Sequence, residues 1–318
     1  MADTLMVETS SAVEKLAGRL EAWEPWQLTG LTPTPEEEWQ RLRAFLKLGR
    51  ADFDAMVQTV EPLLQHAHEM VVANYDHLLA DHDTAAILGW EEGADPAHLA
   101  ERRRFFTVWI ARTLGMDLSA DFAQYLFRAG KFHAAHGPRQ IHVPEIYVTG
   151  AVSLVTAGFA AILAEEMPGH PATAPALAGW NKVLAMHLNA MLAGYRAACA
   201  LDTGEFAVEV RLFGQMRDAV GCPHLPVRVS HGATAADVLR KFFDYYPQVR
   251  SLVFDVEWDE HLPEHAGGKS WMAAERAYTI KLQPAWRALL NGRNLSHLGG
   301  PHVAVEPGDV IRLYSPGR

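Results

Sequence analysis

The chain has 318 residues, more than one compact core usually holds, so we expect two domains. Its 28 Lys and Arg stand against 38 Asp and Glu, and a net charge of −10 argues against nucleic acid and anionic membranes as partners. Cys199 and Cys222 are too few for a disulfide framework or a cysteine zinc site, which predicts a reducing, cytoplasmic setting.

Residues 1–34 have no clear periodicity and contain Trp23, Pro25, Trp26 and a Thr-Pro-Thr-Pro run. We expect this stretch to be an irregular lead-in to the first domain. Its first residues include acids where a signal peptide has a basic and then an apolar stretch, so we do not expect export.

Residues 35–203 form the first predicted domain, and its apolar residues recur at helical spacing with almost no period-two alternation. Breakers at Gly49, between Gly89 and Pro96, at Gly115, and from Pro138 to Pro144 divide it. This pattern predicts an all-α domain of seven or eight helices.

One stretch of this domain, Ile146 to Ala164, carries no charged residue over nineteen positions, which reaches the lower limit for a membrane span. It also contains Thr149, Ser153 and Thr156. We favour a helix buried on all sides within a helical bundle, and we expect no membrane partner.

Residues 204–318 form the second predicted domain. FAVEVRLF and LPVRVS alternate as strands, ATAADVLRKFFDYYP has helical spacing with Thr234 as its cap and Pro247 as its stop, and two strand regions follow. Asn291-Gly292 and Pro307-Gly308-Asp309 are predicted turns. The order ββαβββ predicts one helix against a mixed sheet, an α+β domain.

The first domain contains candidate ligands for haem iron. Binding a buried haem requires one neutral imidazole, an apolar and aromatic lining, and a distal surface that tunes the gas bound opposite. His133, His136 and His142 cluster near the end of one predicted helix. From the residues alone each of them is more often a solvated or capping histidine than a ligand.

A wider pattern around these histidines resembles the protoglobin and globin-coupled-sensor family. The matching residues are Arg128, a Gly-x-x-His formed by Gly130 and His133, then Gly137, and Tyr147 opening the next apolar helix. The resemblance implies a globin fold, a haem b cofactor with His133 as the iron ligand, and Tyr147 among the residues that bind the cofactor.

Two upstream helices extend the resemblance. In VVANYDHLLADHDT, Tyr75 matches the family's distal tyrosine, which can donate a hydrogen bond to the gas, although Asn74 stands where the family has an aromatic residue. In RRRFFTVWIARTLG, Phe105, Phe106 and Trp109 match the residues that pack on the porphyrin. Arg102 to Arg104 is interpreted as a solvated helix face.

Residues 204–318 resemble the ubiquitin-like β-grasp proteins of the molybdopterin-synthase small-subunit and thiamine sulfur-carrier type, apart from an insert near 254–283. Carriers of that type use a flexible Gly-Gly tail, whereas this sequence reads Ser315-Pro316-Gly317-Arg318. We therefore expect a domain for protein contact rather than sulfur-carrier chemistry.

These patterns predict a multidomain protein, an all-α globin followed by a β-grasp domain, which binds O₂, CO or NO reversibly and signals to a protein partner. Two alternatives stay open: a haem redox enzyme of the peroxidase or NO-dioxygenase kind, and a gas- or redox-regulated component of molybdopterin or thiamine biosynthesis. His66, His68 and His77 lie near the distal helix but form no typical acid/base pair. The resemblance also implies a homodimer through the last two long helices.

Overall fold

The computed structural model describes residues 26–258 and 278–315. The chain divides into two compact units. We call Pro33–Ala200 the helical unit, and we call the residues before Pro33 together with those from Leu201 onward the α+β unit. The boundary between Ala200 and Leu201 falls three residues before the predicted boundary at 203/204. The boundary between Thr32 and Pro33 assigns the residues before Pro33 to the same unit as the C-terminal part.

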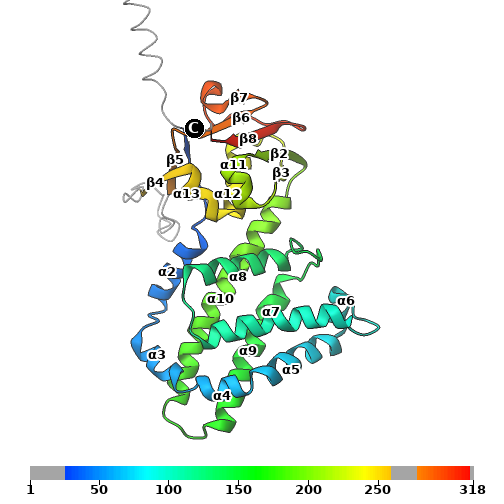
Figure 1. Cartoon of the computed structure of the whole chain (residues 1–318), viewed down its shortest axis with the longest axis vertical. Helices are drawn as coiled ribbons and strands as arrows, with labels where there is room; N and C mark the ends of the chain where they lie inside the picture. The colour runs from blue at the N-terminus through cyan, green and yellow to red at the C-terminus, as the bar shows by residue number, and fades with distance from the viewer. Residues whose placement is uncertain (1–25, 259–277, 316–318) are drawn as a thin grey trace, which may run out of the picture. The chain divides into compact units, whose positions relative to one another are not determined.

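The helical unit contains no strand, as predicted, and has nine helices rather than seven or eight (Figure 1). They are α2 (Pro35–Phe45), α3 (Arg50–Val57), α4 (Val60–Gln65), α5 (Ala67–Ala80), α6 (His82–Leu88), α7 (Pro96–Leu114), α8 (Ala120–His133), α9 (Glu145–Glu166) and α10 (Thr173–Asp202). The extra helices arise because the chain from 60 to 88 is interrupted at His66 and Asp81.

Local chemistry explains where several of these helices begin. Thr34 accepts a hydrogen bond from the Glu37 backbone N–H, and the Glu37 side chain accepts one from Thr34 N–H, which completes a capping box before α2. Asp95 caps α7 and Ser119 caps α8 in the same way through their side-chain oxygens. These caps stabilise the two helices that carry most of the site described below.

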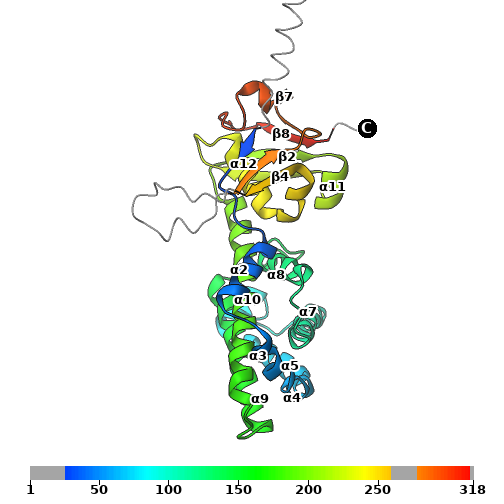
Figure 2. The same ribbon diagram turned by 90° about the vertical axis from the view of Figure 1, so that its left-hand side faces the viewer.

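The charge-free helix α9 is not buried on all sides, so that expectation was wrong. One stripe of it, Val148, Val152, Val155, Phe159 and Leu163, lies in the core of the helical unit. Ile146 and Leu154 are 72% and 43% exposed. Within the described residues α9 alone is long and apolar enough to cross a membrane, by length and composition only. Figure 2 shows it as one of the long green helices of this unit.

Helices α8 and α10 cross at two glycines. A Cβ atom added to Gly130 would overlap the backbone of Met191, and one added to Gly194 would overlap the backbone of Phe127. Only a residue without a side chain allows the two helix backbones to come this close. The crossing fixes the position of the C-terminal half of α8 in the core.

The α+β unit is built on a five-stranded mixed sheet in the order β3-β2-β8-β6-β7. Its strands are β2 (Phe206–Leu212), β3 (His224–Val229), β6 (Arg287–Leu290), β7 (Arg293–Asn294) and β8 (Val310–Tyr314). Strands β2 and β8 are parallel, with Val210 opposite Ile311, and the other pairs are antiparallel. The short helix α11 (Gly214–Val220) follows β2.

The main helix of this unit, α12 (Ala235–Tyr245), starts at a Thr234 capping box and is followed by Pro247, as predicted. Its Val238, Leu239, Phe242 and Phe243 are fully buried. The Asn291-Gly292 turn between β6 and β7 is confirmed, with φ values of 50° and 85° that suit these two residues. The helix α13 (Arg250–Val253) precedes the remaining strands.

A second, three-stranded sheet in the order β1-β5-β4 contains β1 (Gln27–Leu28), β4 (Phe254–Trp258) and β5 (Tyr278–Leu282). The described ends of the predicted insert are therefore strands. The predicted irregular lead-in contributes β1, which pairs with β5; residues 1–25 of the lead-in lie outside the described residues.

A buried ionic cluster fixes residues before Pro33 in the α+β unit. Arg250 Nη2 donates to Asp244 Oδ1 at 2.6 Å, and Arg250 Nη1 donates to the Thr32 carbonyl at 2.6 Å. The Thr32 backbone N–H and hydroxyl both donate to the same Asp244 oxygen at 3.0 Å. The chain therefore enters the helical unit from, and returns to, one α+β unit.

We predict that Gly194→Ala destabilises the protein by about 1–3 kcal/mol, because the added methyl group would force α8 and α10 apart. Gly150→Ala, in α9, is the matched control: no atom lies within 4 Å of its added Cβ, so higher helix propensity should leave stability equal or slightly raised. Urea unfolding of both variants measures this. Equal stability of Gly194→Ala and the parent chain would contradict the close crossing.

Candidate functional site

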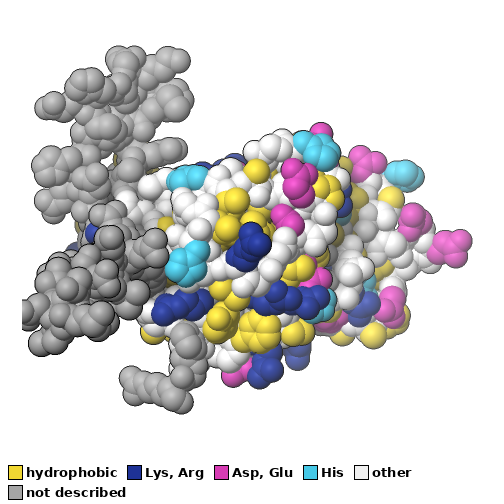
Figure 3. Space-filling view, turned by 90° about the horizontal axis from the view of Figure 1, so that it is seen from above, with side chains coloured by type: hydrophobic (Ala, Val, Ile, Leu, Met, Phe, Trp, Pro, Cys, Tyr) yellow, Lys and Arg dark blue, Asp and Glu magenta, His cyan; other side chains and the backbone are white. Residues whose placement is uncertain are grey.

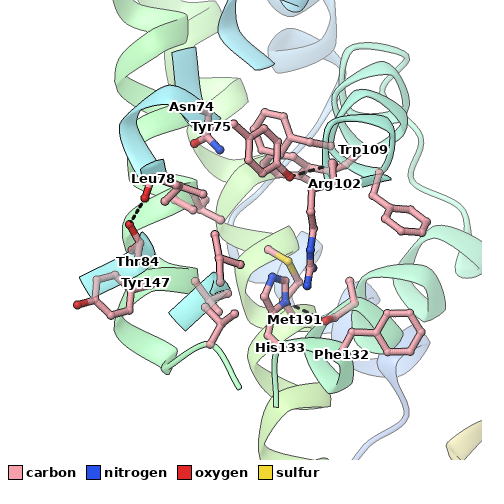
Figure 4. Close-up of a pocket in the computed structure, with 18 of the residues that line it drawn as sticks. Asn74, Tyr75, Leu78, Thr84, Arg102, Trp109, Phe132, His133, Tyr147 and Met191 are labelled. Carbon is pink, nitrogen blue, oxygen red and sulfur yellow. Dashed lines mark hydrogen bonds between the residues drawn. The ribbon is translucent and has the colours of Figure 1, made fainter. Parts of the chain in front are cut away.

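A cavity of about 250 Å³ lies within the helical unit (Figure 4). Helices α5, α6, α7, α8, α9 and α10 all contribute to its walls, which are mostly aliphatic and aromatic. The lining includes every site residue predicted from the sequence, namely Tyr75, Phe105, Phe106, Trp109, His133 and Tyr147. Residues from helices far apart in the chain therefore meet around one apolar space.

His133 is the last residue of α8 and is held from two sides. Its Nδ1 lies 2.8 Å from the Ala129 carbonyl of the preceding turn, which can only accept, so Nδ1 carries the proton. The His133 carbonyl accepts a 2.7 Å hydrogen bond from Val143 N–H, which ties the following loop to the end of the helix. The lone pair of His133 therefore lies on Nε2.

The His133 ring is neutral at physiological pH. Burial lowers its pKa to about 4, and the nearby Arg102 charge acts in the same direction, while the hydrogen bond to Ala129 opposes them. A neutral imidazole whose other nitrogen donates to a backbone carbonyl is the form in which histidine ligates metals. Gly130, one turn earlier, lets α8 approach α10 and so places this ring on the cavity wall.

Tyr75 lies on α5 at the opposite side of the cavity and is only 8% exposed. Its hydroxyl donates to the Arg102 carbonyl at 2.9 Å. Burial raises the pKa of this phenol to about 12, so the hydroxyl keeps its proton and acts as a donor. The neighbouring Asn74 also lines the cavity, and its buried Oδ1 has no hydrogen-bond partner among the described residues.

The three aromatic residues of α7 lie in different environments. Phe106 packs between Tyr75 and Trp109, with ring centroids 6.0 and 5.2 Å away. Trp109 is buried, whereas Phe105 is 42% exposed beside Arg104. Phe105 and Trp109, four positions apart on α7, both line the cavity, but Phe106 makes the ring contact with Trp109 and Phe105 is the most exposed of the three.

The Trp109 indole is held by a hydrogen bond to a buried histidine, His187, which the sequence analysis did not identify. Trp109 Nε1 donates to His187 Nδ1 at 3.3 Å. The His187 ring stacks on Trp39 with centroids 5.7 Å apart, and burial lowers its pKa to about 3. His187 is therefore neutral and serves as an acceptor within the core.

Tyr147 lines the cavity near the start of α9, but its hydroxyl is used elsewhere: it donates to Asp83 Oδ2 at 3.1 Å. Burial and the Asp83 charge both raise the pKa of this phenol. Tyr147 therefore presents its ring, and not its hydroxyl, as a wall of the cavity.

Arg102 corrects the interpretation of Arg102 to Arg104 as a solvated face. Arg104 is exposed and Arg103 pairs with Asp76 at 3.5 Å, but Arg102 lines the cavity. Figure 4 shows its side chain extending from α7 toward His133. Arg128 of the sequence motif also lines the cavity.

The other candidate histidines do not line the cavity. His142 Nε2 lies 2.7 Å from the Tyr195 hydroxyl, and His66 pairs with Glu69 and Glu166. Within the described residues, no group of three or more His, Cys, Asp or Glu residues could hold a bare metal ion. A metal held mainly by a porphyrin needs only one protein ligand, and His133 is suited to that role.

Sequence reasoning missed Met191 and Val143 as cavity residues. Met191 lies on α10, 58 positions after His133, and only the helix crossing brings it near. The one signal available for Arg102 was its position seven residues before Trp109, which places both on one face of a helix.

A partly buried neutral imidazole at the end of one helix, on the wall of an apolar cavity inside a helical bundle, is typical of a globin-like domain. A model of the protoglobin family matches residues 35–199, slightly more than half of the 318 residues. The chain belongs to the protoglobin family, and its globin fold is followed by an α+β domain of the β-grasp class.

Similar proteins cover the two parts separately. Small archaeal modifier protein 3 of Haloferax volcanii is 27% identical over 109 residues, 34% of this chain and 94% of that protein. The solution structure of small archaeal modifier protein 1 from Methanosarcina acetivorans is 27% identical, with 35% of this chain and 93% of that chain covered and a TM-score of 0.25. The globin domain of a Geobacter sulfurreducens globin-coupled sensor is 18% identical, with 49% and 97% covered and a TM-score of 0.41.

The protonation state of His133 predicts how stability depends on pH in the cofactor-free protein. Its folded pKa of about 4 lies below the ordinary value of 6.5, so the unfolded chain binds more protons and stability falls as pH drops from 6.5 toward 4. Between pH 7 and pH 5 this single group should remove about 2 kcal/mol.

Urea unfolding of the cofactor-free protein at pH 7 and pH 5 measures this loss. In His133→Asn the loss between the two pH values should shrink, since the titrating group is gone, while His187 still contributes its part. His68→Asn, at an exposed position on α5, is the matched control and should behave as the parent chain. An unchanged pH dependence in His133→Asn would mean that its ring is not buried and neutral.

Proposed function

We propose that the helical unit binds haem b through His133 Nε2 and reversibly binds a diatomic gas such as O₂, CO or NO. The observation that carries this proposal is the neutral His133 ring, with Nδ1–H held by the Ala129 carbonyl and the ring on the wall of the apolar cavity. Family membership of residues 35–199 supports it independently.

The residues around the cavity fit a porphyrin. The apolar side chains of Phe106, Trp109 and Val152 suit its macrocycle, and Arg102 and Arg128 are the cations nearest to it for its carboxylates. The unpartnered Asn74 Oδ1 is a buried polar atom that lacks a hydrogen bond until a ligand or water supplies one. When bound, haem supplies an iron with one open coordination position for the gas.

Tyr75 is the residue that would distinguish between gases. Its protonated hydroxyl donates to the Arg102 carbonyl and its side chain lines the cavity, so this O–H is the donor that a bound gas would take over from the carbonyl. A donor stabilises a ligand that gains negative charge, as O₂ does, more than it stabilises CO. We therefore assign Tyr75 the role of favouring O₂.

No specific observation favours the redox-enzyme alternative. The cavity lining contains no Asp or Glu among the described residues, so the acid/base pair that peroxidase-like chemistry would use is not provided there. His66, His68 and His77 do not line the cavity either.

We propose that the β-grasp domain is the contact for a protein partner. Its resemblance to small archaeal modifier proteins supports this role. Arg211 lies directly opposite Arg312 on the parallel strands β2 and β8, and Arg211 forms an ion pair with Glu209 of its own strand. Lys and Arg side chains, dark blue, are among those on the surface seen in Figure 3. Sulfur-carrier chemistry depends on residues 316–318, which lie outside the described residues.

Helix α10 connects the cavity to the α+β unit, because it carries Met191 of the cavity wall and ends at Asp202 in that unit. We propose that a movement of the cavity wall is transmitted to the β-grasp domain along this helix. A gas can change the output only if it binds two arrangements of the protein with different affinities. We therefore propose signalling as a second step, in which gas binding changes the contact between the β-grasp domain and its partner.

We also propose a homodimer through α9 and α10, since Ile146 and Leu154 leave an apolar face of α9 exposed. Ile146→Glu/Leu154→Glu should convert dimer to monomer, because a carboxylate buried at the interface would lose its hydration. Sedimentation velocity measures the state of both proteins. High protein concentration favours association, so the parent chain is measured at about 50 μM. A monomeric parent chain at that concentration would contradict this proposal.

The haem proposal is tested by the visible absorption spectrum of protein expressed with haem supplied. The parent chain should show a haem spectrum that changes on reduction and again on addition of CO. In His133→Ala the iron loses its protein ligand, so the spectrum should be lost or strongly altered. A spectrum unaffected by this substitution would move the ligand to another residue.

Tyr75→Phe is the matched control for loss of the cavity, because it removes only one oxygen. It should keep the haem spectrum and CO binding, while O₂ should dissociate about tenfold faster, as expected for one hydrogen bond. Stopped-flow measurement of both gases separates the two effects. Equal acceleration for CO and O₂ would point to a change in cavity shape rather than a lost donor.

A further inference from the structure

The cavity contains a cation with no anionic partner. Arg102 lines the apolar cavity, and burial lowers the pKa of its guanidinium. Within the described residues no carboxylate forms an ion pair with it, because the adjacent Glu101 pairs with Arg139 at 2.8 Å. A partly buried guanidinium loses hydration, and this loss is offset only when an anion or several acceptors approach it.

The side-chain partner that Arg102 does have cannot satisfy it fully. Arg102 Nε lies 3.0 Å from His98 Nε2, and Trp90 Nε1 lies 3.1 Å from His98 Nδ1. Both approaching groups are obligate donors, while a neutral imidazole has a single acceptor nitrogen. One of the two contacts must therefore place two N–H groups face to face.

His98 lies between these two donors, and its ring is held in place by burial and packing. It is 4% exposed, its ring contacts Trp90 with centroids 5.1 Å apart, and its pKa is lowered by burial and then by the Arg102 charge. When Nδ1 accepts from Trp90, His98 Nε2–H and Arg102 Nε–H face each other across 3.0 Å, which leaves no room for an acceptor between them. An anion in the cavity would give the Arg102 guanidinium the acceptor that His98 then does not provide.

We propose that Arg102 is the anion-binding residue of the cavity and that His98 is the residue that positions it. The ligand chemistry is an anionic group carried into an apolar space. Two sources provide it: a propionate carboxylate of the porphyrin, or a small anion added to the haem-loaded protein. This inference rests on the proposed haem binding and names the polar contact that would accompany it.

The test compares haem with haem dimethyl ester, which has the same macrocycle but no carboxylates. In Arg102→Met, haem should dissociate about tenfold faster than from the parent chain, as expected for a lost charge-assisted hydrogen bond. The ester should dissociate at equal rates from both proteins. Arg104→Met removes an exposed arginine of the same helix and should change neither rate.

Cyanide titration of the ferric protein distinguishes the second source. If Arg102→Met leaves both dissociation rates unchanged but weakens cyanide binding about tenfold, the anion at Arg102 is the added one. If dissociation and cyanide binding are both unchanged, Arg102 binds no anion and the inference is overturned. If the parent chain releases haem and the ester at equal rates and Arg102→Met does not weaken cyanide binding, the inference fails while haem binding stands. If neither macrocycle binds, the proposed function fails as well.

The positioning role of His98 has its own readout. His98→Leu should reproduce part of the Arg102→Met effect with haem and none with the ester, because only the carboxylate contact depends on where the guanidinium lies. His98→Gln, which retains an acceptor and a donor, should restore most of the parent rate. A His98→Leu effect of equal size on both macrocycles would mean that His98 acts on the fold alone, and the positioning role would be overturned.

Discussion

The close crossing of α8 and α10 is the constraint on which the rest of the helical unit depends. Gly130 and Gly194 allow each helix to lie against the backbone of the other, and this contact places the end of α8 beside the cavity. His133 then has its orientation set by the Ala129 carbonyl and its neutrality set by burial. The Gly-x-x-His spacing thus places a packing glycine and the proposed iron ligand on the same helical turn.

The cavity combines an apolar wall with a few polar groups that are incompletely satisfied. Asn74 Oδ1 lacks a partner among the described residues, and Arg102 and Trp90 compete for the single acceptor of His98. Unsatisfied buried polar groups cost stability, so they are expected where a ligand completes the site. The Trp109 indole N–H is used by His187 Nδ1, while the buried His187 Nε2 has no partner among the described residues.

The two units are joined in an order that the sequence did not suggest. Residues 27–28 pair with β5, and Thr32 is held by Asp244 and Arg250, so the chain starts in the α+β unit before it forms the helical one. The helical unit is thereby joined covalently to the α+β unit at both of its ends.

The sequence by itself determined the helical character of residues 35–203, the cap at Thr234, the Asn291-Gly292 turn and the helix carrying His133, because periodicity, capping and turn chemistry act over a few residues. The family resemblance alone predicted that Tyr75 and His133 belong to one site. Only the tertiary structure decided that Arg102 faces inward, that His187 supports Trp109, that α9 has an exposed side and that β1 belongs to the second unit. Those outcomes depend on contacts between residues far apart in the chain, and a local pattern contains no information about which distant side chain will fill a given space.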